Sequence, residues 1–179
     1  MEEYITQKLD CEVDSKISDI SNYDIEKYEK WHLGSQGQRT GQYYAGIDDF
    51  DLFIPKFDTT IQHNDQVGKM QDLVYNMEKL QKRELNQRGT YDYVFGNSLS
   101  DYKNLDCKND KKILIMTDSM GECVNQYLIM GFGEIKTLSD YTSEDLTAEV
   151  IQEYNPDIVI LLYYPIFLQE NSVGFNFSF

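Results

Sequence analysis

The clearest pattern of hydrophobic and polar positions lies in the last third of the chain. Residues 113–116 and 158–162 are apolar at every position, and a shorter, partly alternating run covers residues 134–138. Between these runs, apolar residues recur every three or four positions over 120–131 and 143–154. The pattern predicts the order strand, helix, strand, helix, strand. Short right-handed crossovers in that order give a parallel sheet with helices on both faces.

The same spacing predicts which side chains form the core of this unit. The side chains expected to point inward are Val124, Tyr127 and Leu128 on the first helix, and Leu146, Val150, Ile151 and Tyr154 on the second. Thr142 with Asp145 predicts a cap at the start of the second helix, and Asn155-Pro156 predicts its end. The last strand, expected over 157–164, is apolar on both faces, which is typical of a strand buried between two layers of helices.

Upstream of this unit the patterns are shorter. Residues 65–86 carry apolar side chains at spacings of three and four, which predicts a helix. Residues 34–46 are punctuated by glycines and predict a loop, and residues 48–61 are expected to be extended. Alternating apolar positions at 91–95 and 173–179 predict two further short strands.

The first thirty residues differ in composition from the rest. They hold nine acidic and four basic residues, with few apolar positions. Those apolar positions recur at spacings of three and four, so either a short amphipathic helix or a mobile arm is compatible with them. We therefore expect an acidic N-terminal arm over residues 1–30 and an α/β domain over residues 31–179.

The charge balance excludes two classes of partner. The 179 residues include 16 Lys and Arg against 31 Asp and Glu, a formal net charge of −15. Such a chain cannot replace the counterions along a nucleic-acid backbone, and an anionic membrane surface repels it. No run reaches the roughly 20 apolar residues of a membrane helix, so we expect no direct membrane insertion by this chain.

No cofactor or metal ion is predicted. The three cysteines, Cys11, Cys107 and Cys123, form no Cys-x-x-Cys pair, and with only two histidines they make no zinc set. The glycine-rich stretch 34–41 lacks the Gly-Lys-Ser/Thr ending of a phosphate-binding loop. The acidic residues around Asp49 are expected to face water rather than to hold a metal ion.

The most informative short motif is Thr-Asp-Ser-Met at residues 117–120, where the first buried strand is expected to end. In an open α/β sheet the ligand crevice opens at the carboxyl ends of the strands, where the winding reverses. If the first strand is central, Ser119 lies at that crevice, with Tyr163 and Tyr164 across from it. Backbone N–H groups at the start of the following helix can stabilise a developing oxyanion there.

A purely structural interpretation of the same serine is also open. Ser119 and Glu122 match a capping box, in which the serine hydroxyl accepts a hydrogen bond from a backbone N–H and the glutamate reaches back. On this interpretation the serine starts a helix and has no chemical role.

Around this serine the chain resembles a known family. The stretch Lys-Ile-Leu-Ile-Met-Thr-Asp-Ser-Met at 112–120, with Pro-Asp-Ile-Val-Ile-Leu-Leu-Tyr-Tyr-Pro at 156–165, is similar to the SGNH (GDSL-like) hydrolases. The segment 33–50 and the stretch Tyr-Asp-Tyr-Val-Phe-Gly at 91–96 resemble the branch called DHHW proteins. That branch is related to the alginate O-acetyltransferases of the AlgJ/AlgX type. The resemblance covers residues 30–165.

The resemblance implies a flavodoxin-like, three-layer SGNH core with a parallel sheet, and acyl-ester chemistry. In that family a serine attacks the ester, a histidine is the base and an aspartate orients the histidine. Carried over, Ser119 is the nucleophile, and its own N–H contributes to the oxyanion hole. The residues expected to line the substrate are Asp118, Tyr163, Tyr164 and Arg39. The implied substrate is a polysaccharide or another acyl ester, and the implied location is extracytoplasmic or at the cell surface.

The sequence departs from the family pattern at two places. Thr117 stands where the family usually has glycine. The Asp-x-His motif, which in this branch comes before the serine block, is absent: Lys30 precedes His32 by two residues, and Ile61 precedes His63. His32 is the one candidate base, although a surface or core role is favoured for it, and His63 is expected in a loop.

These departures predict a fold that is incomplete at its N-terminus, with an upstream segment that carries the missing pair, and little activity from this chain alone. Two functions stay open. The first is an SGNH-type serine esterase or O-acetyltransferase that acts on cell-surface polysaccharide, and the second is a non-catalytic carbohydrate-binding or scaffolding module. Arg39 can meet an acidic sugar or form an internal salt bridge with Asp48 or Asp49, and the salt bridge is favoured.

Overall fold

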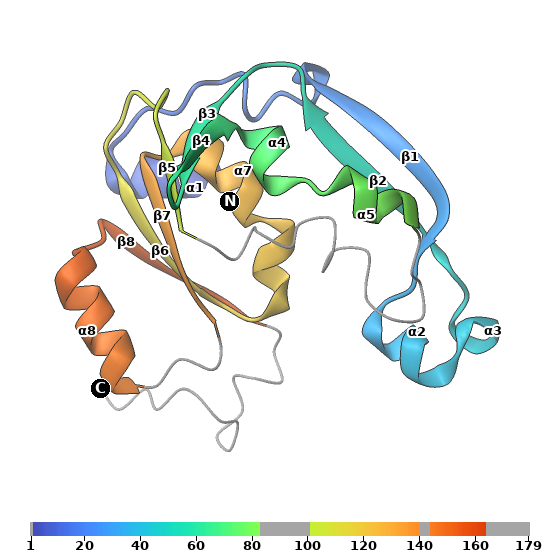
Figure 1. Ribbon diagram of the computed structural model, residues 1–179. Helices are drawn as coiled ribbons and strands as arrows, with labels where there is room; N and C mark the ends of the chain where they lie inside the picture. Colours follow the sequence, from blue (N-terminus) through green and yellow to red (C-terminus); the bar gives the residue numbers. More distant parts are fainter. Residues whose placement is uncertain (1, 83–100, 140–143, 164–179) are drawn as a thin grey trace.

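The computed structural model of the chain describes residues 2–82, 101–139 and 144–163 (Figure 1). The strands, in chain order, are β1 (Tyr23–His32), β2 (Asp48–Pro55), β3 (Thr60–His63), β4 (Gln66–Lys69), β5 (Tyr102–Asn104), β6 (Lys112–Thr117), β7 (Glu134–Ser139) and β8 (Ile158–Leu162). The α-helices are α1 (Glu2–Leu9), α2 (Ser35–Thr40), α3 (Gln42–Ala45), α4 (Met70–Val74), α5 (Met77–Lys82), α7 (Asn125–Gly131) and α8 (Glu144–Tyr154). Two 3-10 helices are η1 (Ile20–Asn22) and η2 (Ser119–Cys123).

Six strands form the main sheet in the order β4-β3-β5-β7-β6-β8. β6 pairs in parallel with β7 on one side and with β8 on the other, so that Ile115 lies between Thr137 and Ile160. β4, β3 and β5 extend the sheet through antiparallel pairings. The predicted parallel arrangement, with the first buried strand in the centre, is confirmed for β7, β6 and β8, and the sheet as a whole is mixed.

Helices cover both faces of this parallel part of the sheet. On one face α7 shares a buried core with the strands, and this core includes Ile113, Ile115, Leu128, Ile129 and Ile135. α8 lies on the opposite side of the strands (Figure 1). There Lys112 Nζ donates to the carbonyl oxygen of Tyr154, the last residue of α8, at 3.3 Å. The predicted α/β class with helices on both faces is therefore confirmed.

β8 is less buried than its sequence predicts. Val159 and Leu161 are 40% and 44% exposed, although the apolar run predicted a strand covered on both faces. The other side of the strand does pack against the core, through Ile158 and Ile160. β8 is the last strand in the order of the described sheet, so it has one strand neighbour instead of two. The predictions for residues 91–95, 142 and 173–179 lie outside the described residues.

The acidic N-terminal residues contribute to the core and to a hairpin. Ile5 of α1 and Ile17 are 2% and 7% exposed, so both belong to the packed interior. β1 then pairs antiparallel with β2. This strand is not predicted by the sequence because β1 itself is mostly exposed and charged. Phe50 and Leu52, which are almost fully buried, lie on β2, the strand that pairs with β1.

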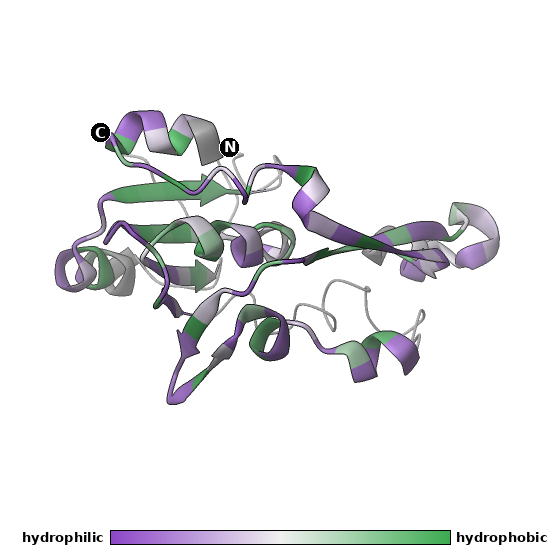
Figure 2. Ribbon diagram, turned by 90° about the horizontal axis from the view of Figure 1, so that it is seen from above, coloured by the Kyte–Doolittle hydropathy of each residue, from purple (hydrophilic) through white to green (hydrophobic). Residues whose placement is uncertain are grey.

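The β1–β2 hairpin projects away from the main sheet and carries α2 and α3 at its far end (Figure 1). Residues 34–46, expected to be a loop, form these two short helices, so that prediction is wrong. Gly41 and Gly46 follow the helices with φ of 89° and 74°, a conformation that residues with a Cβ rarely adopt. In Figure 2 much of the hairpin is hydrophilic, whereas strands of the main sheet are largely hydrophobic.

The single helix predicted over residues 65–86 is also wrong. Its first residues form β4, which pairs with β3 across a two-residue turn at Asn64 and Asp65, and α4 and α5 follow. Asn64 has φ 52°, the left-handed conformation that such tight hairpin turns require. Val67, expected on the apolar face of the helix, is 60% exposed on β4. The tight turn at Asn64 therefore leads the next residues into a paired strand, although their apolar spacing is that of a helix.

Candidate active site

Ser119 lies at the carboxyl end of β6, the central strand of the parallel part of the sheet. Every residue from Ile113 to Asp118 is buried, whereas Ser119 is exposed. The 3-10 helix η2 begins at Ser119 and leads into α7. The structure therefore places this hydroxyl where strands on both sides of β6 end, which is where a ligand crevice opens in such sheets.

Thr117 stands where the sequence resemblance led us to expect glycine. Thr117 is fully buried at the end of β6, and it is not among the described residues with positive φ. Its Oγ1 lies 2.9 Å from the carbonyl oxygen of Asp118 and 2.7 Å from that of Leu162, the last residue of β8. A glycine could make neither hydrogen bond. The hydroxyl thus links the turn before Ser119 to the neighbouring strand.

The start of η2 differs from the predicted capping box. Ser119 is the first helical residue rather than the cap, and the carbonyl oxygen of Asp118 accepts a hydrogen bond from the N–H of Gly121 at 3.2 Å. Within the described part of the chain, no hydrogen bond holds the Ser119 hydroxyl. The side chain of Glu122 is outside the described residues, so its share in capping stays a prediction.

Two of the residues expected to line the substrate lie at this edge of the sheet. Asp118 is 6% exposed, so little of its surface is accessible to a ligand. Leu162 pairs with Thr117, which places Tyr163 directly after β8 and level with Asp118. Tyr163 is half-buried there. The other predicted tyrosine, Tyr164, lies outside the described residues.

His63 lies far from Ser119 within the same sheet. β3 is three strands from β6, which at about 4.8 Å per strand is roughly 14 Å. The His63 ring lies 4.9 Å from the ring of Tyr102, and Tyr102 pairs with Ile135 near the start of β7, at the opposite end of the parallel strands from Ser119. Its Nδ1 lies 3.3 Å from the carbonyl oxygen of Asp101. His63 therefore cannot act as a base for Ser119 in this arrangement.

His32 belongs to a different sheet from Ser119. It ends β1 and pairs with Asp48 in the projecting hairpin. Its Nε2 lies 3.7 Å from where a Cβ on Gly34 would be, so the ring is close to the chain that leads into α2. No hydrogen bond joins it to Ser119. The assignment of His32 as the base therefore stays a prediction that no described contact supports.

Arg39 lies in the last turn of α2, where its side chain is exposed. The predicted salt bridge to Asp48 or Asp49 is wrong: no ion pair involves Arg39 among the residues that the structure describes. Asp49 instead accepts a hydrogen bond from the backbone N–H of Lys30 at 2.8 Å. Lys30 has φ 54° at the irregularity in β1, which aims its N–H at the carboxylate.

Two buried amides that follow the serine were not expected from the sequence. Asn125 and Gln126 are both 0% exposed, whereas Val124 and Tyr127, predicted to point inward, are half-buried. Asn125 Nδ2 donates to Oγ1 of Thr137 on β7 at 3.1 Å. Neither amide atom of Gln126 has a hydrogen-bond partner in the described part of the chain. The signal in the sequence is a pair of polar residues at the start of an otherwise apolar helix.

Metal ligands, cysteines and apolar helices are the remaining features to place within residues 2–82, 101–139 and 144–163. No group of three or more His, Cys, Asp or Glu side chains gathers there as a metal site. Cys11, Cys107 and Cys123 form no disulfide with one another, and all three are half-buried. None of the helices in these ranges is long and apolar enough to cross a membrane.

Solved structures of the same fold exist. The chain resembles a DHHW family protein from Eubacterium siraeum DSM 15702, with a TM-score of 0.59 and 17% identity, over 98% of this chain and 59% of that one. It also resembles Bacillus cereus PatB1 with a sulfonyl adduct, with a TM-score of 0.58 and 17% identity, over 86% of this chain and 50% of that one. A second PatB1 structure has a TM-score of 0.56 and 15% identity, over 86% of this chain and 52% of that one. No family model and no curated protein matches the sequence.

At these identities the likeness shows a shared fold. The chain spans about half the length of the two PatB1 structures, at 50% and 52%, and 59% of the DHHW family protein. Nothing in the likeness singles out the AlgJ/AlgX branch, so that finer expectation stays a prediction. The fold implied by the sequence resemblance is confirmed, because this chain shares its α/β fold with a DHHW family protein and with PatB1.

Proposed function

We propose that this chain carries the nucleophile of an SGNH-type acyl-ester site, with Ser119 as the attacking group. One observation carries the proposal: an exposed serine lies two residues after the end of a buried strand, with parallel strands ending on both sides of that strand. The fold shared with PatB1 and with a DHHW family protein supports it. One PatB1 structure holds a sulfonyl adduct, and sulfonyl reagents form such adducts with nucleophilic side chains.

The proposed reaction begins when Oγ of Ser119 attacks the carbonyl carbon of an ester. The carbonyl oxygen becomes an oxyanion, and the first N–H groups of a helix have no acceptor inside the helix. The N–H of Gly121 is already bonded to the carbonyl of Asp118, which leaves the N–H groups of Ser119 and Met120 as the donors. Donors fixed in this way stabilise the oxyanion without reorganising during the reaction. The oxyanion then collapses, the ester C–O bond breaks and the original alcohol leaves with a proton, so that the acyl group stays on the serine. Water or a second alcohol then takes the acyl group and frees the serine hydroxyl.

The proton that leaves Oγ of Ser119 requires a base. His63 lies three strands away from β6 in the sheet, and no described hydrogen bond joins His32 to Ser119. Loss of the histidine from a serine triad lowers kcat by a factor on the order of 10⁶. We therefore expect ester turnover by this chain alone to stay near background until a base is supplied.

The finer form of the proposal is an esterase or O-acetyltransferase that acts on polysaccharide at the cell surface. It rests on the DHHW-type resemblance around residues 33–50 and 112–120. Arg39 is exposed at the far end of the hairpin, where its guanidinium could bind the carboxylate of an acidic sugar.

A non-catalytic carbohydrate-binding role is the second candidate, and the lack of a described hydrogen bond between Ser119 and either histidine favours it. Tyr43 and Tyr44 on α3 are 94% and 91% exposed, and such rings offer flat surfaces to sugar rings. In this role Ser119 would have no chemical function, and binding of a glycan would not depend on it.

Chemical rescue tests the first candidate directly. Turnover of p-nitrophenyl acetate is measured with increasing imidazole, which can replace a missing histidine base. We expect turnover by the parent chain to rise with imidazole above that of Ser119→Ala in the same buffer. The matched control is Ser15→Ala, a change at an exposed serine, which should behave like the parent.

Two results separate the candidates. Equal turnover by the parent and Ser119→Ala at every imidazole concentration would rule out Ser119 as a nucleophile. Glycan-array binding that is unchanged in Ser119→Ala but lost in a Tyr43→Ala, Tyr44→Ala double variant would then support the binding module.

A further inference from the structure

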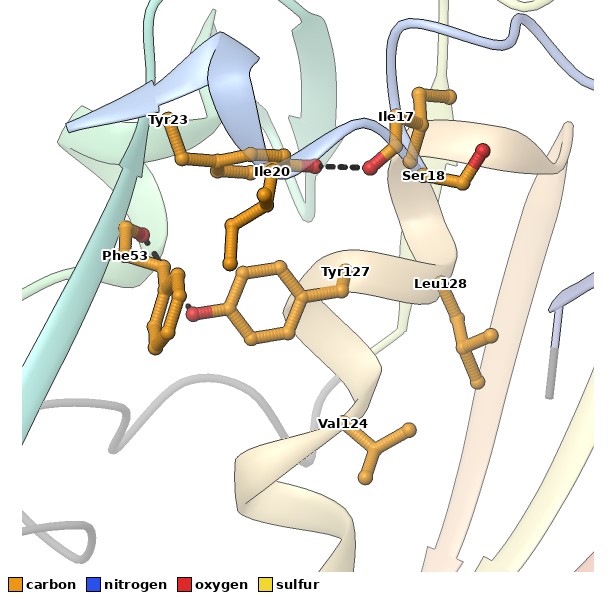
Figure 3. Close-up of a pocket in the computed structure, with 8 residues that line it drawn as sticks. All are labelled: Ile17, Ser18, Ile20, Tyr23, Phe53, Val124, Tyr127 and Leu128. Carbon is orange, nitrogen blue, oxygen red and sulfur yellow. Dashed lines mark hydrogen bonds between the residues drawn. The ribbon is translucent and has the colours of Figure 1, made fainter. Parts of the chain in front are cut away.

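A cavity of 390 Å³ opens beside α7, and none of the residues assigned to the proposed reaction lines it (Figure 3). Val124, Tyr127 and Leu128 form one wall, because spacings of three and four place them on one face of the helix. Ile17 and Ile20, from the segment before β1, form the opposite wall. Segments far apart in the sequence therefore build the cavity together.

The cavity reaches from the surface into the core. Ile17, Tyr23 and Leu128 in its walls are 7%, 9% and 4% exposed, so its inner end is part of the packed interior. Ile20 is 62% exposed and marks the opening. A hollow with buried walls and one open side can admit a small molecule without unfolding the chain.

The described walls present hydrocarbon almost everywhere. No charged side chain lines them, and the two tyrosine hydroxyls are directed at protein carbonyls. The Tyr23 hydroxyl donates to the carbonyl oxygen of Ile17 at 2.7 Å, and the Tyr127 hydroxyl lies 3.5 Å from that of Phe53 (Figure 3). A charged ligand group would lose its hydration there and gain no partner.

We propose that this cavity binds the neutral hydrocarbon part, above all an aromatic ring system, of a small molecule. Its volume exceeds the roughly 150 Å³ of an apolar cavity that holds benzene. The rings of Tyr23 and Tyr127 lie 6.3 Å apart at 70°, an edge-to-face pair that a further ring can extend. The net charge of −15 disfavours anionic amphiphiles such as fatty acids. The site does not depend on the proposed function of Ser119.

Two probes with the same ring skeleton test the ligand class. N-phenyl-1-naphthylamine is neutral, and 8-anilino-1-naphthalenesulfonate carries a sulfonate. Fluorescence titration of the full chain should show saturable binding of the neutral probe at one site per chain. The anionic probe should bind at least about tenfold more weakly, a difference of about 1.4 kcal/mol.

Three variants test the location. Val124→Phe fills the cavity, and Ile20→Asp places a charge at its opening. Each should therefore raise the dissociation constant of the neutral probe by about tenfold or more. Ile20 is exposed, so its replacement keeps the test valid if Val124→Phe does not fold, which a thermal melt would show. The matched control Val67→Phe, at an exposed position on β4, should bind like the parent.

Several results would overturn the proposal. These are binding that does not saturate, equal affinity for the two probes, or neutral-probe binding that Ile20→Asp leaves unchanged. Light scattering that shows a dimer from which the neutral probe is excluded would also overturn it, because a second copy of the chain would then occupy the cavity.

Discussion

Oγ1 of Thr117 lies 2.7 Å from the carbonyl oxygen of Leu162, so the last residue of β6 is bonded to the last residue of β8 through a side chain. The same two residues are partners in the parallel ladder. The hydroxyl therefore adds a contact at the point where the backbone pairing ends. This contact holds the two strand ends together beside the turn that carries Ser119.

Thr117→Val keeps the shape of this buried side chain and removes its hydrogen bond. We expect the free energy of unfolding to fall by about 1 kcal/mol, the usual net value of such a bond. Urea unfolding measures the loss. The matched control is Thr60→Val, at a half-buried position on β3 where the hydroxyl has no described partner, and it should cost less. Equal losses in the two variants would contradict the role given to the Leu162 contact.

The fold is predictable where its causes are local in the sequence. β6, β7, β8, α7 and α8 follow from apolar runs and helical spacing that are visible within a dozen residues. β1 is not predictable in this way, because its reason to be extended is its pairing with β2. β4 is missed because a turn at Asn64 redirects the chain before the helical spacing can act.

The candidate site is likewise only partly predictable from the sequence. The position of Ser119 follows from the order of three strands, which the local pattern predicts. The positions of His32 and His63 depend on pairings of β1 and β3, which the local pattern does not contain. The burial of Gln126 depends on how α7 is rotated about its axis against the sheet. The apolar spacing of Val124 and Tyr127 predicts a different rotation, in which these two side chains are buried instead.

Asn104 is a buried side chain whose loss should be costly. Its Nδ2 donates to the carbonyl oxygens of Ile129 and Met130 at 2.7 and 3.0 Å, and its Oδ1 accepts from the N–H of Asp106 at 3.0 Å. The Asn104 amide therefore donates to carbonyl oxygens in the last turn of α7, which receive no hydrogen bond from an N–H of the helix.

Asn104→Ala should therefore lower the free energy of unfolding by about 2–3 kcal/mol, because it leaves buried carbonyls unpaired. Urea unfolding is again the measurement. Asn22→Ala removes one bond to the carbonyl of Lys16, at 3.1 Å and near the surface, and should cost less than half as much. A similar cost for both variants would mean that Asn104 does not secure the end of α7.

Gln126 should behave in the opposite way. Its amide is 0% exposed, and both of its polar atoms lack a described hydrogen-bond partner. A buried unsatisfied amide costs about 1–3 kcal/mol, and methionine has a similar shape without the polar atoms. Gln126→Met should therefore raise the midpoint of thermal unfolding, whereas Gln66→Met, at an exposed position of β4, should leave it unchanged. A lower midpoint for Gln126→Met would show that the amide is satisfied after all.

Asp157 links the start of β8 to the start of β6. The N–H of Lys112 donates to its Oδ2 at 2.8 Å, and Nζ of Lys111 lies 3.2 Å from its Oδ1. The Lys112 hydrogen bond, and then the Lys111 ammonium, hold the pKa of the Asp157 carboxyl below its ordinary value. Because the pKa is lower in the folded chain, the carboxylate stabilises the fold above the unfolded pKa of about 3.9. That contribution is lost as the pH falls through the folded pKa.

Asp157→Asn should therefore lower the free energy of unfolding at neutral pH, by about 1 kcal/mol for a partly exposed group. The difference from the parent should shrink as the pH falls below about 4, where the parent carboxylate also becomes neutral. Asp51→Asn, at an exposed position of β2, controls for the loss of one negative charge. Urea unfolding across this range measures both differences. A difference for Asp157→Asn that stays constant or widens toward acid pH contradicts the direction of the pKa shift.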